Sequence, residues 1–227
     1  MKQSTIPFSF DVLAASRHSV RLACSRPFHS VITLFILGLT TMAPTYFITY
    51  YTDARTSLFL FYLRAIGIYL LSAYIRDAAL IFAIHSTTRT PLYFSHIAYR
   101  AFLNLILSLK AVLWILAGLF NLSILRRFFL FSLLPAVVAR HPHPKAITLS
   151  EIERKAGKRW NDLFWLLIVI TFSVNIVFLI PRLIPGLPPI FFKACVSAIS
   201  NLMISIEIAY HLPYFQPDEV PDYAVKV

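Results

Sequence analysis

Long apolar runs separated by short polar segments form the dominant pattern along the chain. A hydrocarbon core of about 30 Å requires roughly 20 apolar residues in helical conformation. Six runs satisfy this requirement, at residues 31–51, 57–84, 101–120, 122–139, 163–180 and 190–210. The fourth run is the weakest, because Pro135 interrupts it and because Arg126 and Arg127 must extend to an interface. The pattern predicts an all-α, polytopic membrane helix bundle with six transmembrane helices.

The basic residues are distributed unevenly between the two sides of this bundle. If the N-terminus is cytoplasmic, the cytoplasmic segments hold 13 of the 21 basic residues, namely Lys2, Arg17, Arg21, Arg26, Arg89, Arg100, Arg140, Lys145, Arg154, Lys155, Lys158, Arg159 and Lys226. The outer segments hold 4, namely Arg55, Arg126, Arg127 and Arg182. Because cytoplasmic loops collect Lys and Arg, both termini are predicted to be cytoplasmic. Without the fourth span the basic block at residues 140–159 would lie outside, so the charge count supports that span.

Composition narrows the class of protein. Hydrophobic residues make up 58% of the 227 positions and charged residues 14%, whereas soluble domains have about 45–50% and about 25%. A soluble enzyme, a disordered chain and a secreted disulfide scaffold therefore fit poorly. The net charge of +11 follows from basic cytoplasmic loops, so nucleic acid is not an expected partner. We expect a multi-pass protein of the cell membrane, with a cytoplasmic N-terminal amphipathic segment at 1–28, a membrane domain at 29–211 and a cytoplasmic tail at 212–227.

Residues 150–160 predict a helix that lies in the membrane interface. Its apolar face carries Ile152, Ala156 and Trp160 at a spacing of four residues. The other face is basic and consists of Arg154, Lys155, Lys158 and Arg159. Indole favours the membrane boundary, and Lys and Arg bind anionic headgroups. The four basic residues together with Trp160 are therefore the candidate site for lipid headgroups on the cytoplasmic face.

Serine-led segments at 9–17, 95–101 and 150–156 resemble one another. Each continues from a possible N-cap serine into small, branched and basic residues, and then into a long apolar run. This indicates a three-fold internal repeat, in which each unit is an interfacial helix followed by two spans. The second copy merges into its span. Chance similarity between short amphipathic loops is the alternative.

Three stretches carry a family resemblance: 8–17, then 79–85 with 95–101, and 131–139 with 150–160. Over nearly the whole chain the arrangement resembles the YciC-like bacterial integral membrane proteins. It is also similar to the membrane domain of glycerophosphoryl diester phosphodiesterases. The resemblance implies a six-helix inner-membrane protein of poorly defined activity, and it implies no catalytic residue.

Two ionisable residues lie deep within the predicted spans. Asp77 and Lys110 fall at matching depths, roughly 10–14 Å below the cytoplasmic boundary at about 1.5 Å per residue, on sequential antiparallel helices. A paired Asp and Lys is far less costly in hydrocarbon than either charge alone. The pair either fixes the register of the helices or lines a polar cavity, and the absence of contact stays open. Arg76 could pair with Asp77 in place of Lys110. Glu207 lies one turn from the inner end of its span, so its carboxylate is expected to reach the membrane interface.

The sequence holds no GxSxG or HExxH motif and no glycine-rich phosphate loop, so no catalytic residue, cofactor or metal is expected. Three functions stay open. The pattern favours a structural or scaffolding protein that organises envelope lipid or protein. The alternatives are a small transporter or permease subunit with a polar site near Asp77 and Lys110, and a membrane enzyme acting on lipid headgroups. Membrane lipids are the expected partners, with a homo-oligomer or another membrane protein left open.

Overall fold

A computed structural model describes residues 8–50, 57–88, 93–117, 130–141, 144–150, 152, 160–177 and 189–211. Every regular element in these ranges is helical. The elements are α1 (Phe8–Ser25), α2 (Pro27–Tyr50), α3 (Leu58–Thr88), α4 (Phe94–Ala117), α6 (Leu130–Arg140), the 3₁₀ helix η1 (Pro144–Ala146), α8 (Trp160–Val177) and α10 (Pro189–His211). The all-α class predicted from the sequence is therefore confirmed.

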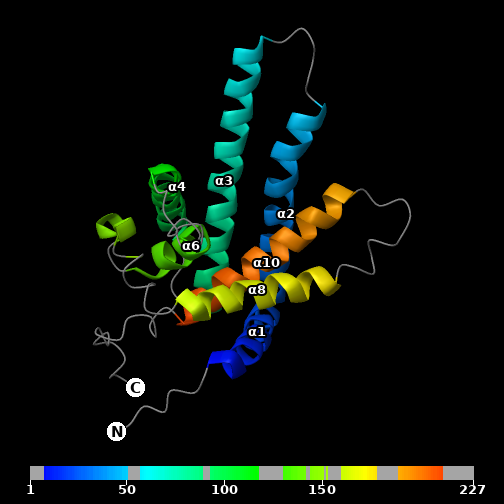
Figure 1. Cartoon of the computed structure of the whole chain (residues 1–227), viewed down its shortest axis with the longest axis vertical. Helices are drawn as coiled ribbons and strands as arrows, with labels where there is room; N and C mark the ends of the chain where they lie inside the picture. The colour runs from blue at the N-terminus through cyan, green and yellow to red at the C-terminus, as the bar shows by residue number, and fades with distance from the viewer. Residues whose placement is uncertain are drawn as a thin grey trace.

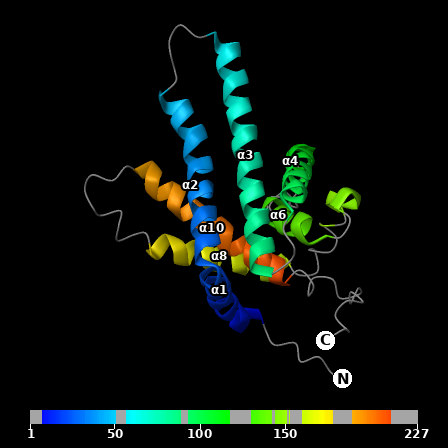
Figure 2. The same ribbon diagram turned by 180° about the vertical axis from the view of Figure 1, so that it is seen from behind.

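A proline separates the amphipathic helix α1 from the apolar helix α2. Pro27 begins α2 and has no backbone N–H to donate to the carbonyl of Ala23. The hydroxyl of Ser30 donates to that carbonyl instead, at 2.7 Å. The chain therefore changes direction without leaving this acceptor unpaired, and α1 lies below the end of α2 (Figure 2).

Helices α2 and α3 lie side by side and extend beyond the rest of the molecule (Figure 1). In their outer part Phe47 stacks on Phe61, with ring centroids 5.9 Å apart. The surface of α3 there consists largely of exposed apolar side chains, namely Leu58, Phe59, Leu60, Tyr62, Leu63 and Ile66. So large an apolar surface is unusual in water and is the ordinary surface of a helix in hydrocarbon.

Helix α10 holds the other half of the molecule together. It packs against α1, α2, α3, α6 and α8. Half of the residues in the most apolar stretch of α10 are buried within the protein, whereas only 6% of those in the most apolar stretch of α3 are buried. The alanines of one hydrophobic cluster, Ala79, Ala83 and Ala198, come from α3 and α10. Small side chains let helix backbones approach closely where no water is available to drive association.

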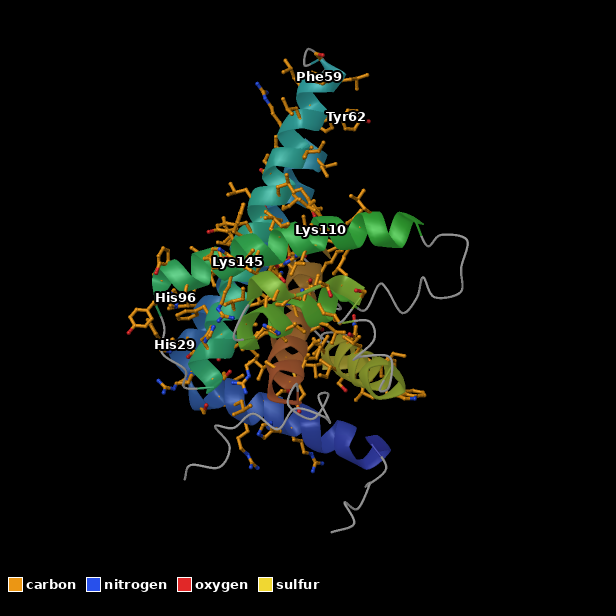
Figure 3. The ribbon with its side chains drawn as sticks, turned by 90° about the vertical axis from the view of Figure 1, so that its left-hand side faces the viewer. His29, Phe59, Tyr62, His96, Lys110 and Lys145 are labelled. Carbon is orange, nitrogen blue, oxygen red and sulfur yellow. The ribbon has the colours of Figure 1, made fainter. Side chains whose placement is uncertain are left out.

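Four helical segments are long and apolar enough to cross a membrane: Pro27–Ile48, Leu58–Thr87, Phe94–Leu113 and Pro189–Ala209. They correspond to the first, second, third and sixth predicted spans. Helix α4 runs unbroken from Phe94, so the second copy of the proposed repeat forms the start of a longer helix. Helix α4 crosses α3 steeply instead of running beside it (Figure 3).

The fourth and fifth predicted spans are present only in part. Helix α6 has 11 residues, a length of about 16 Å at about 1.5 Å per residue, and is too short to cross a core of about 30 Å. The rest of that predicted span, up to residue 129, lies outside the described residues. Helix α8 has 18 residues, and its apolar stretch is Leu167–Val177. Six spans and a three-fold repeat therefore remain predictions.

The packing of α2 against α3 and α10 can be tested with two leucines of α2. Leu37 is 1% exposed and Leu39 is 50% exposed. Leu37→Ala is expected to lower the free energy of unfolding by about 2–5 kcal/mol, because it leaves a cavity in the cluster. Leu39→Ala is the control and should cost well under that amount, since its side chain faces the lipid or detergent. Thermal unfolding in detergent measures both, and equal losses would contradict the observed orientation of α2.

Candidate functional site

A carboxylate lies on the inner face of α3. Asp77 is 1% exposed, and it shares this face with Leu80, Ile81 and Ile84 at spacings of three, four and seven residues. The helix thus directs a charged group into the protein. An ionised carboxylate in such surroundings requires hydrogen bonds and a counter-charge.

Two neighbours supply these interactions. The side-chain amide of Asn104, on α4, donates to Oδ2 of Asp77 at 2.7 Å. The guanidinium Nε of Arg76 donates to Oδ1 at 3.2 Å and forms an ion pair. The Arg76 side chain is 39% exposed, whereas that of Asp77 is 1% exposed. The negative charge is therefore buried, and its counter-charge extends toward the surface.

Asn104 retains one unused hydrogen-bonding group. The residue is 1% exposed, and within the described part of the chain its Oδ1 has no hydrogen-bond partner. A buried acceptor without a partner costs about 1–3 kcal/mol. Such a group is a candidate contact for a bound water or ligand.

A cavity of about 300 Å³ opens beside Asp77. Its walls come from α3, α4, α6 and α10, and most of them are apolar. Its polar lining consists of Arg76, Asp77, Ser108, Asn201 and Ser205. Pockets that bind small molecules have volumes of about 300–1,000 Å³ and combine apolar walls with a few polar groups. This cavity is at the lower end of that range, so it suits a small ligand.

The structure does not bring Asp77 and Lys110 together. Asp77 is held by Arg76 and Asn104, and Lys110 is exposed on α4 (Figure 3). The six residues from Asn104 to Lys110 amount to a rotation of about 240° around the helix. At about 1.5 Å per residue, Asn104 and Lys110 also lie about 9 Å apart along α4, so matching depth selects the wrong level as well as the wrong direction. Arg76, the competitor noted in the sequence, forms the ion pair.

The predicted headgroup site falls almost entirely outside the described residues. Arg154, Lys155, Lys158 and Arg159 all lie there. Trp160 begins α8, and the position of its side chain is not described. The lipid-facing role of this segment stays a prediction.

The burial of Glu207 differs from the prediction. An easy exit to the interface is predicted from the sequence, yet the residue is fully buried, with 0% exposure. Its Oε2 lies 3.6 Å from Nδ1 of His18, on α1. The amphipathic helix α1 therefore covers the end of α10 and encloses the carboxylate. The hydrophobic pattern of the sequence gives no signal for this contact between α1 and α10.

Arg100 is a structural residue that the hydrophobic pattern does not single out. Its guanidinium, on α4, donates to the carbonyls of Val138, Ala139 and His141 at the end of α6, the last two at 3.0 and 3.1 Å. The last carbonyls of a helix have no partner within the helix. Arg100 thus caps α6 and fixes it against α4, and so positions Pro135 on the cavity wall.

The chain matches no protein-family model, no curated protein and no solved structure. The fold and the site define the class as an all-helical protein with apolar helices of membrane-spanning length and, among them, a largely apolar cavity with a few polar groups. The resemblance to the YciC-like proteins stays a prediction.

The partner of Asp77 can be identified with double-mutant cycles. Asn104→Leu should lower the free energy of unfolding by about 1.5–3 kcal/mol, because it removes a hydrogen bond to a charged group. Combined with Asp77→Leu, the total loss should be smaller than the sum, since no buried polar group is then left unpaired. Thermal unfolding in detergent provides the values.

Lys110 provides the matched control for this cycle. The losses from Asp77→Leu and Lys110→Met should add to within about 0.5 kcal/mol, as expected for sites that do not touch. Coupling of Asp77 to Lys110, together with additivity of Asp77 and Asn104, would contradict the geometry.

Proposed function

We propose that this protein is an integral inner-membrane protein of the small transporter or permease-subunit class. The observation that carries the proposal is the position of Asp77, a buried carboxylate on the wall of an open cavity among apolar helices. Ionisable residues within membrane helices are rare, and they mark substrate and ion pathways. A scaffolding protein, the function that the sequence favours, has no need of such a cavity.

The lining indicates the chemistry of the solute. The charges of Arg76 and Asp77 cancel, so the site offers hydrogen bonds without a net charge. Ser108 contributes a hydroxyl from α4, and Ser205 and Asn201 contribute polar groups from α10 on another wall. Apolar side chains such as Leu105 complete the cavity. The proposed ligand is a small solute, neutral or zwitterionic, with an apolar part.

The membrane arrangement belongs to the same proposal. We place both termini in the cytoplasm and count six spans, with the fourth at residues 122–139 as the sequence predicts. The excess of basic residues in the cytoplasmic segments supports this orientation. The exposed Arg17 and Arg21 support an interfacial position for α1. A relation to the YciC-like proteins is consistent with this arrangement and forms part of the proposal.

Cysteine labelling tests whether the cavity is filled with water and can be reached from the aqueous phase. In a Cys24→Ser, Cys195→Ser background, which removes both native cysteines, a charged thiol reagent should label Ser108→Cys in native membranes. The same reagent should leave Leu113→Cys unlabelled, because Leu113 is 67% exposed on the lipid-facing side of the same helix. An uncharged maleimide, which enters lipid, checks that both thiols are reactive.

Solute flux gives the second arm of the test. In proteoliposomes, Ser205→Phe should reduce the entry of small neutral osmolytes by filling the cavity, while Leu113→Phe should not. Labelling of Ser108→Cys by the uncharged reagent alone, with no protein-dependent flux, would exclude the transporter proposal and favour scaffolding.

A further inference from the structure

Basic side chains converge where the ends of α3, α4 and α6 meet. We define the basic cluster as His85 of α3, His96 and Arg100 of α4, and Arg140 of α6. His96 lies one helical turn before Arg100, so the two share a face of α4. The guanidinium of Arg100 binds the carbonyls of Ala139 and His141, which directly flank Arg140. His85 interacts electrostatically with the other three members.

Two aromatic contacts extend the cluster at its edges. The ammonium of Lys145, in η1, lies 5.6 Å from the centroid of the Tyr99 ring, next to Arg100 in sequence. His29 of α2 stacks on Phe82, one turn before His85, at 5.3 Å between centroids. Figure 3 places His29, His96 and Lys145 on the same side of the molecule. The cluster thus lies in a region to which α2, α3, α4, α6 and η1 all contribute basic side chains.

The described carboxylates are engaged elsewhere. Among side chains that the structure describes, Asp77 binds Arg76 and Asn104, and Glu207 contacts His18. Those electrostatic neighbours of His85 that the structure describes are the basic residues Arg100, Arg140 and His96. Two guanidinium groups brought to one place concentrate positive charge, which favours the binding of an anion.

The geometry points to a site for a phosphate group at the basic cluster. Arg presents a planar fork of donors that matches phosphate oxygens, and the neighbouring imidazole of His96 adds an N–H donor. The exposed His96 and Lys145 keep the site open to the outside. The group belongs either to the head of an anionic phospholipid or to a soluble phosphate compound. This site shares no residue with the cavity at Asp77. The phosphate site can therefore be confirmed or excluded without deciding the proposed transport function.

Charge-neutralising variants of the full-length chain test the site. His96→Gln and Arg140→Gln remove two bases and leave Arg100 in place, because Arg100 also caps α6. The control is Arg64→Gln, which removes an exposed positive charge near the opposite end of α3. Circular dichroism and size-exclusion profiles must match those of the wild type before binding is compared.

The lipid arm uses nanodiscs of phosphatidylcholine with and without phosphatidic acid. Wild-type protein should retain phosphatidic acid through detergent exchange, and Arg140→Gln should retain about fivefold less, the loss expected for one basic residue near an anionic surface. His96→Gln should add to this loss. Arg64→Gln should retain as much as the wild type.

The soluble arm uses delipidated protein and inorganic phosphate, with calorimetric titration as the readout. Binding of phosphate that weakens in Arg140→Gln assigns the site to a soluble phosphate compound, whereas retention of phosphatidic acid alone assigns it to a lipid head. Both results support the phosphate site. Absence of binding in both arms, or an equal loss in Arg64→Gln, would overturn it.

Discussion

The burial of Asp77 is the constraint on which the inner half of the molecule depends. A carboxylate enclosed by apolar helices needs partners for both oxygens, and the loss of one partner from a buried ion pair costs about 3–5 kcal/mol. Arg76 comes from the same helix and imposes no tertiary requirement. Asn104 comes from α4, and its 2.7 Å bond therefore fixes the rotation and the level of α4 against α3. The cavity is the space left beside this contact once α10 closes the third side.

The long helices are predictable from the sequence because the physics that specifies them is local. Four of the six apolar runs correspond to helices of spanning length, and α3 is the longest of them. The contact that fixes the C-terminal end of α6 is not predictable from this pattern. That end of the helix is stabilised by Arg100, which is 38 to 41 residues distant in sequence from the carbonyls it binds. Contacts at such separation leave no trace in a hydrophobic pattern.

The partner of Asp77 is also not predicted correctly, because charge and depth do not report which face of a helix a residue occupies. Charge and depth together select Lys110, and they pass over a neutral amide about 9 Å away along the same helix. The helical period of α4 contains the missing information. Ala101, Asn104, Leu107 and Ala111 recur every three or four residues and are all buried, whereas Lys110 falls outside this set. A polar residue on the apolar face of a membrane helix is thus a better guide to a buried site than depth alone.

One face of α4 holds both the residue that binds Asp77 beside the cavity and a residue of the basic cluster. Arg100 and Asn104 are four residues apart, so they occupy successive turns of that face, and each binds a different neighbour: the end of α6 and the carboxylate of α3. Along α3, Asp77 and His85 are separated by about 12 Å at about 1.5 Å per residue. Because the two anchors lie on one rigid helix, a shift of α4 that breaks the bond to Asp77 also displaces the cap of α6. The geometry of α4 therefore links the interior of the cavity to the basic cluster at the ends of the helices.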